Sequence, residues 1–113
     1  METINEVIRE SRLKAGLVSA LAQYLSYVNR FDEGDGLEEL LENMREDAPF
    51  VLMQQKMLEE AARRMTLAEE RGLAAETLEP GKEQLKETAG LVMEALDDVY
   101  GGLQSLERRI AGA

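Results

Sequence analysis

Apolar residues recur along the chain at alternating spacings of four and three positions, the period of an α-helix, over three long stretches. Gly34, Gly36 and Gly72 lie between these stretches, and no segment alternates apolar with polar residues as a strand would. The pattern predicts helices over about 4–30, 37–71 and 80–110. Because the connections are short, neighbouring helices must run antiparallel. The sequence therefore predicts one all-α domain over residues 1–113, an up-down-up bundle of three helices with coiled-coil character.

The first predicted helix starts with a capping box and carries apolar residues on more than one face. Thr3 and Glu6 are three positions apart, so each side chain can accept a hydrogen bond from the backbone N–H of the other residue. Two apolar rows follow at helical spacing, one of Ile4, Ile8, Ser11, Ala15, Val18, Ala22 and Leu25, the other of Leu13, Leu17, Ala20, Tyr24, Tyr27 and Phe31. Together they cover roughly 240° of the helix circumference, so either this helix lies between the two others or one row faces a partner chain. Lys14 falls inside the apolar arc and must extend to solvent or reach a carboxylate.

The middle apolar stretch keeps one heptad phase on both sides of Pro49. Its positions are Leu37, Leu41, Met44, Ala48, Val51, Gln55, Leu58, Ala62 and Met65. Proline removes a backbone hydrogen bond, so the stretch is either one helix kinked at Pro49 or two helices divided near 47–49 with Asp47 as a cap, and the unbroken phase favours the first interpretation. Its outer face predicts the ion pairs Glu59–Arg63 and Glu60–Arg64. Gly72, followed by Leu73 folding back on Ala68, is typical of a Schellman ending.

The last predicted helix has the most regular pattern of the three. We expect Pro80 in its first turn, where proline is tolerated. Its seam consists of Leu85, Ala89, Val92, Leu96, Val99, Leu103, Leu106 and Ile110. Gly101 and Gly102 lie off the seam, which indicates a close approach or a local bend. Methionines at or beside seam positions, mainly core filling but also suited to adaptable surfaces, are Met44, Met53, Met57, Met65 and Met93.

Composition excludes several classes of protein chemistry. The 113 residues include 13 basic and 23 acidic side chains, a net charge of −10, and no histidine, cysteine or tryptophan. Catalytic triads, thiol nucleophiles, zinc fingers and disulfides are therefore excluded. The acidic balance disfavours nucleic acids and anionic membranes, and no apolar run approaches the roughly 20 residues of a membrane span. Because the first residues do not read as a secretory signal, we expect a cytoplasmic protein.

Carboxylates are the remaining candidates for catalysis. The run from Glu38 through Glu39 to Glu42, and Glu94 with Asp97, are similar to the EExxE and ExxD strings of all-α nucleotide pyrophosphohydrolases. That resemblance implies carboxylates that hold Mg²⁺ against a triphosphate. If the second and third helices fold back on each other about residues 72–80, Asp97 lies opposite residues 54–55, roughly 18 Å from Glu42. We therefore predict no catalytic site, metal or cofactor, and keep the pyrophosphohydrolase as an alternative.

Acidic residues concentrate between positions 32 and 47. This run holds eight acids and one arginine, a local charge of −7, and its Gly spacing does not match a calcium-binding EF-hand loop. One interpretation is a solvated turn, with Asp35 as the cap of the next helix. The other is a patch for a basic partner, as in an immunity or anti-toxin protein, formed by Asp32, Glu33, Asp35, Glu38, Glu39 and Glu42.

Residues 31–73 resemble the flagellar export chaperones of the hook-filament junction type. The resemblance rests on Glu33-Gly34-Asp35, Leu37-Glu38-Glu39-Leu40-Leu41, Leu58-Glu59 with Arg63, and Gly72-Leu73. It implies a chaperone that sequesters a helical segment of a secreted protein by helix-in-groove docking. We therefore expect a protein-binding bundle, an export-type chaperone or adaptor, that contacts a helical client or a second copy of itself. The residues expected to bind the partner are Leu13, Leu17, Tyr24, Tyr27 and Phe31.

Overall fold

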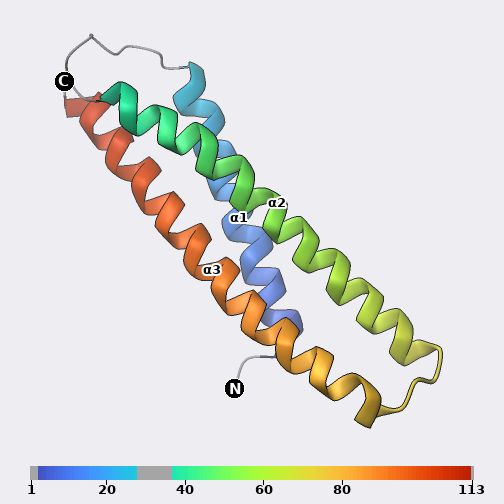
Figure 1. Cartoon of the computed structure of the whole chain (residues 1–113). Coiled ribbons are helices and arrows are strands. Elements are labelled where there is room, and N and C mark those ends of the chain that lie inside the picture. Colours follow the sequence, from blue (N-terminus) through green and yellow to red (C-terminus); the bar gives the residue numbers. More distant parts are fainter. Residues whose placement is uncertain (1–2, 28–36, 113) are drawn as a thin grey trace.

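The computed structural model describes residues 3–27 and 37–112, with the side chains of all of these except 37–41 and 43. These residues form helices α1 (Ile4–Tyr27), α2 (Leu37–Glu70) and α3 (Ala75–Gly112) (Figure 1), and the described part of the chain contains no strand. The helices run up, down and up and pack against one another, which confirms the predicted all-α three-helix bundle. The molecule is elongated, with extents of 59 × 23 × 18 Å. None of the described helices is long and apolar enough to cross a membrane.

Helix α1 begins with the predicted capping box and buries one of its two apolar rows. The backbone N–H of Glu6 donates to Thr3 Oγ1 at 3.2 Å, and the N–H of Thr3 donates to Glu6 Oε2 at 3.1 Å. The buried residues of α1 are Ile8, Ser11, Ala15, Val18 and Leu25, all from the first row. The interpretation that α1 lies between the other two helices is wrong, because its second row faces away from them. Leu13 and Tyr24 of that row are more than half exposed.

Helix α2 is a single helix that contains Pro49, as the unbroken heptad phase favours. Asp47 therefore lies inside the helix and does not cap a second one. The side chains that α2 buries are Ala48, Val51, Gln55 and Leu58. The helix ends in the predicted Schellman motif: Gly72 has a φ of +86°, and the N–H of Leu73 donates to the carbonyl of Ala68 at 3.2 Å. Glycine suits this position because it adopts positive φ without steric cost.

Helix α3 begins at Ala75, five residues earlier than predicted. Pro80 consequently lies beyond the first turn, and its position in the helix was predicted wrongly. The reason is local: the N–H groups of Thr77 and Leu78 already donate to the carbonyl of Ala74, and Leu78 is buried in the same heptad phase as the later seam. The predicted seam residues from Leu85 to Leu106 are all buried, so the coiled-coil-like contact of α3 is confirmed.

Two glycines of α3 fix its register against α2. A Cβ atom at Gly102 would lie 3.1 Å from Met44 Sδ, and one at Gly81 would lie 2.9 Å from Met65 Cε. The sequence indicates a close approach or a local bend at Gly101 and Gly102. The close approach occurs at Gly102, whereas a Cβ at Gly101 would meet nothing within 4 Å. This register places Asp97 level with Pro49. The expectation that Asp97 lies opposite residues 54–55 is wrong because α3 starts sooner after the turn.

Polar side chains join α1 to both of its neighbours. Lys14 Nζ lies 3.0 Å from Asp97 Oδ1 and 4.9 Å from the centre of the Tyr100 ring, so this lysine reaches the carboxylate it was expected to need. Arg12 of α1 pairs with Glu59 of α2, so the predicted Glu59–Arg63 pair does not form. Burial alone would raise the pKa of Glu59, but hydrogen bonds from the Gln55 amide and the Arg12 guanidinium lower it below its ordinary value.

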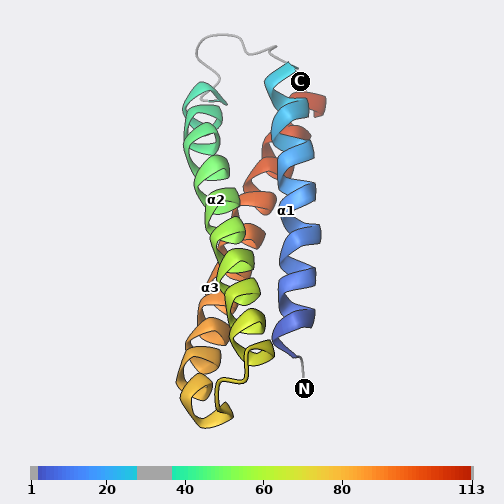
Figure 2. The same ribbon diagram turned by 90° about the vertical axis from the view of Figure 1, so that its right-hand side faces the viewer.

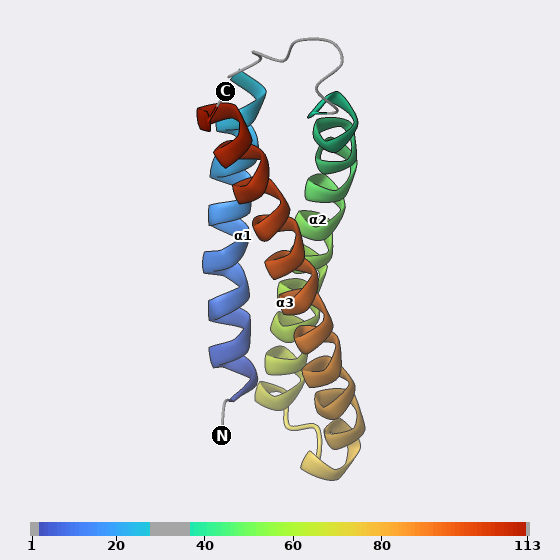
Figure 3. The ribbon, with the colours of Figure 1, turned by 90° about the vertical axis from the view of Figure 1, so that its left-hand side faces the viewer.

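The three helices differ in length, and this shapes the ends of the bundle. Helix α1 has 24 residues, whereas α2 has 34 and α3 has 38. The turn between α2 and α3 therefore extends past the start of α1, as Figure 2 shows. Helix α3 runs diagonally across the other two, beside α2 near the turn and toward α1 at its C-terminal end (Figure 3). One side of the α2–α3 pair is consequently covered by α1, and the other side is not.

Candidate functional site

The outer face of α1 carries most of the residues expected to bind a partner. The side chains of Leu13 and Tyr27 are 67% and 88% exposed, and those of Leu17 and Tyr24 are about half exposed. These four side chains recur at helical spacing on the side opposite the buried row. Phe31, the fifth residue of the set, lies outside the described residues. The outer face of α1 thus presents an apolar row to solvent, and its role in binding stays a prediction.

The predicted acidic and catalytic residues are only partly described. Asp32, Glu33 and Asp35 lie outside the described residues, as do the side chains of Glu38 and Glu39, while the side chain of Glu42 is exposed. In the observed register Asp97 is seven residues from the level of Glu42, or about 10 Å along the bundle. Asp97 itself pairs with Lys14. Among the described residues, no three acidic side chains gather closely enough to hold a metal ion.

The groove between α1 and α2 is polar near the start of α1. The hollow there, of about 600 Å³, is lined by nine residues, five of them charged: Arg12, Lys56, Glu59, Glu60 and Arg63. Two of these, Arg12 and Glu59, are held in an ion pair across the groove. Docking an apolar partner here would require desolvation of these charges, which costs free energy. This part of the groove is therefore a poor site for an apolar ligand.

The groove between α2 and α3, on the side away from α1, has the opposite character. It encloses about 510 Å³, and its lining residues are Phe50, Met53, Gln54, Met57, Leu58, Ala61, Met65, Gly81, Gln84, Leu85, Thr88 and Val92. None of these twelve residues carries a charge. The absence of a side chain at Gly81 leaves room in the floor, where the methyl group of Met65 approaches. We call this the methionine groove.

Large apolar side chains stand exposed along the methionine groove. Phe50, Met53 and Met57 of α2 are 56%, 53% and 65% exposed, and they follow each other at spacings of three and four residues. Leu91 of α3 is 67% exposed and lies one turn beyond Thr88 of the lining. Exposed apolar surface of this kind, continuous along two helices, is typical of an interaction site.

Sequence reasoning assigned Met53 and Met57 mainly to core filling, and this assignment is wrong. Met57 lies one position before the seam residue Leu58 and Met53 lies two positions after Val51, both on the flank that faces away from α1. The 3-4 spacing of Phe50, Met53 and Met57 is a second apolar row like that of α1 and could have indicated an exposed face. What the sequence could not show is which flank of the α2–α3 pair α1 covers, because that depends on the packing of all three helices.

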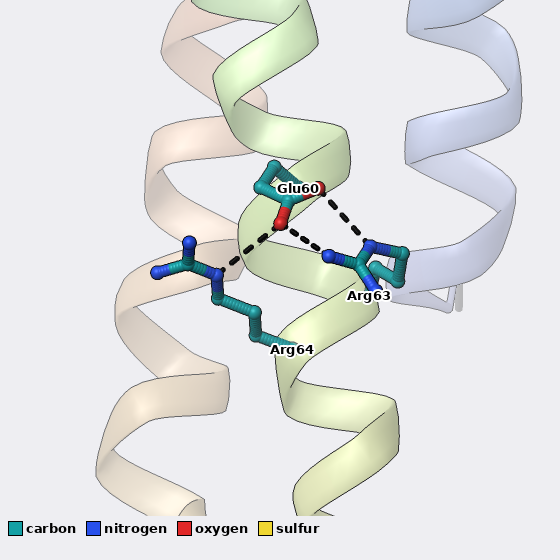
Figure 4. Close-up of polar contacts among 3 residues, drawn as sticks. All are labelled: Glu60, Arg63 and Arg64. Atoms are coloured by element: carbon teal, nitrogen blue, oxygen red, sulfur yellow. Dashed lines mark hydrogen bonds and ion pairs between the residues drawn. The ribbon is translucent and has the colours of Figure 1, made fainter.

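A cluster of three charged residues on α2 includes Arg64, one turn from Ala61 of the methionine groove, whereas Glu60 and Arg63 line the polar groove on the other flank. Glu60 accepts hydrogen bonds from both Arg63 and Arg64, and Figure 4 shows the two arginines reaching this carboxylate from opposite sides. The hydrogen bond from Arg63 lowers the pKa of Glu60, and Glu60 in turn raises the pKa of Arg63. The three side chains are exposed or half-buried, so the pairing contributes little to stability. It does neutralise part of the positive charge beside the groove.

Comparison with known proteins finds no relative of this chain. The chain matches no protein-family model, no curated protein and no solved structure. The candidate site therefore rests on the geometry of the bundle alone.

Proposed function

We propose that the protein binds an amphipathic helix of another protein in the methionine groove, as an export-type chaperone or an adaptor would. The observation that carries the proposal is the uncharged groove between α2 and α3, with Phe50, Met53 and Met57 exposed in one row along it. Helix-in-groove binding needs such a surface, because the apolar face of the incoming helix must find an apolar partner.

The dimensions of the methionine groove suit a helix. From Phe50 to Met65 the α2 wall spans 16 residues, or about 24 Å, which is the length of a helix of roughly 16 residues. Methionine side chains are unbranched and polarizable, so they adapt to differently shaped partners. A bound helix would cover the α2–α3 pair on the side that α1 leaves open.

The exposed side chains set the scale of the affinity. Complete burial of a Leu, Met or Phe side chain contributes about 1.5–3 kcal/mol, and rather more than half of that remains available at each of the four exposed positions. Together they offer about 4–7 kcal/mol before the entropic cost of association. We therefore expect dissociation constants in the micromolar range or weaker for a peptide that makes these contacts alone.

Two substitutions with nearly equal exposure test the location of the site. Met57 is 65% exposed in the methionine groove and Leu13 is 67% exposed on the outer face of α1. The probe is an 18-residue amphipathic helical peptide with leucines on one face and glutamines on the other, titrated by calorimetry. We expect Met57→Glu to weaken binding at least tenfold and Leu13→Glu to leave it unchanged.

The reverse result would place the site on α1, where the sequence predicts it. Absence of binding by the unsubstituted protein at millimolar peptide would contradict helix binding at either surface. Because both residues are exposed, neither variant is expected to unfold the bundle, and circular dichroism melting curves provide the check.

A further inference from the structure

Acidic side chains border the methionine groove on both helices. On α3, Glu87 and Glu94 lie one turn to either side of Leu91, and Asp98 follows one turn later. On α2, Glu46 and Asp47 lie one turn before Phe50. All five side chains are exposed, and none of them makes an ion pair with another described residue.

Positive charge near the groove is partly neutralised. Arg64 is paired with Glu60, and Lys82, near the far end of the groove, is paired with Glu69. The borders of the groove therefore carry unpaired negative charge, while its floor carries none. This combination, an apolar floor between acidic borders, distinguishes the methionine groove from the polar hollow between α1 and α2.

The charges argue against a second copy of the chain as the occupant. If two copies met groove to groove, the five acids of each copy would be brought into the same interface, and like charges brought together at an interface are unfavourable. The whole chain carries a net charge of −10, which adds to this repulsion. An occupant of opposite charge gains from the same arrangement.

We propose that the partner is a basic amphipathic helix, with lysines and arginines on both flanks of its apolar face. This inference rests on the proposed function, since it names the class of helix that the methionine groove takes. The apolar face packs on Phe50, Met57 and Leu91, and the flanking cations lie beside the carboxylates of the borders. Because Glu46, Asp47, Glu94 and Asp98 lie toward the Phe50 end in the observed register, the basic residues concentrate at that end of the bound helix.

Three peptides separate the contribution of charge from that of apolar contact. They share one leucine face over 18 residues and differ in the flanking positions, which are lysine, glutamine or glutamate. We expect the lysine peptide to bind about tenfold more tightly than the glutamine peptide at 20 mM salt, and the glutamate peptide to bind most weakly. At 500 mM salt the three affinities should converge, because screening removes the electrostatic part.

Substitution of the three acids of the α3 border tests whether they cause the preference for the lysine peptide. The triple variant Glu87→Gln, Glu94→Gln and Asp98→Asn should lose most of the preference for the lysine peptide and keep its affinity for the glutamine peptide. A control with the same change in net charge, Glu70→Gln, Glu76→Gln and Glu107→Gln, alters acids away from the groove. It should keep at least two thirds of the preference, expressed as the logarithm of the affinity ratio.

The outcomes distinguish this inference from the proposed function. If all three peptides bind equally and Met57→Glu weakens each of them, the groove binds helices but the inference about charge is overturned. If both triple variants reduce the preference equally, net charge and not the border is responsible, and the inference is again overturned. If no peptide binds, the proposed function itself fails.

Discussion

At the scale of single residues, one buried polar pair stands out in an otherwise apolar core. Gln55 occupies a heptad position of α2 where the pattern calls for an apolar residue, and its Nε2 donates to Ser11 Oγ of α1 at 3.3 Å. The Ser11 hydroxyl in turn donates to the carbonyl of Ile8 at 2.7 Å. Because buried polar groups are costly when unpaired, this pair specifies how α1 docks on α2 more than it stabilises the bundle.

Substituting the two residues separately and together tests this interpretation. Ser11→Ala removes the acceptor and leaves a buried amide N–H without it, so we expect a loss of about 1–2 kcal/mol in the free energy of unfolding. Gln55→Leu restores the apolar heptad position and should be neutral or stabilising. The double variant should then resemble Gln55→Leu, with a coupling energy of about 1 kcal/mol in urea unfolding. Strictly additive effects would show that the two side chains do not depend on each other.

At the scale of helices and turns, the sequence predicts what is encoded locally. The capping box at Thr3, the Schellman ending at Gly72 and the seam of α3 depend on residues within a few turns of each other, and all three are confirmed. The register of α3 against α2 depends on the number of residues in the turn. Because the start of α3 was predicted five residues too late, the predicted position of Asp97 relative to α2 was also wrong. The methionine groove requires the position of α1 as well, and this lies beyond any one stretch of sequence.

Pro49 is the clearest conflict between a residue and its helix. It is the thirteenth residue of α2, and its side chain is exposed. Because proline has no N–H, it cannot donate the hydrogen bond that the carbonyl of Arg45 would otherwise accept. Pro49→Ala restores this bond, and we expect the free energy of unfolding to rise by about 1–3 kcal/mol in urea titrations, less the entropy that proline removes from the unfolded chain. Pro80→Ala is the control: it restores the corresponding bond, to the carbonyl of Glu76, but in the second turn of α3, where the helix end opens more easily, so it should gain less. A loss of stability in Pro49→Ala would indicate that the packing of the core requires a bend there.

At the scale of the whole molecule, the bundle has a three-helix part and a two-helix end. The first turn of α1 lies at the level of Met65 and Leu85, where Thr3 and Ile4 line a shared hollow with them. Beyond this level, toward the turn, α2 and α3 pack only against each other. Between residues 66 and 84 the one buried side chain is that of Leu78, and the one ion pair joining the two helices there is Lys82–Glu69. An exposed ion pair of this kind contributes little, so Leu78 supplies most of the packing at this end.

This difference in packing predicts a gradient of local stability, measurable by amide hydrogen exchange. The amides of residues 68–70, 79 and 81 should exchange at least tenfold faster than those of residues 89–103, because the two-helix end can open without disturbing the core. Leu78→Ala should speed exchange at this end and leave residues 89–103 unchanged. Leu96→Ala, which removes a fully buried side chain from the three-helix part, should speed exchange throughout the bundle. If Leu78→Ala accelerated exchange equally at both places, the two parts would unfold as one unit. Because the methionine groove runs from the three-helix part toward the turn, a bound helix should slow exchange most at the end where the free protein opens.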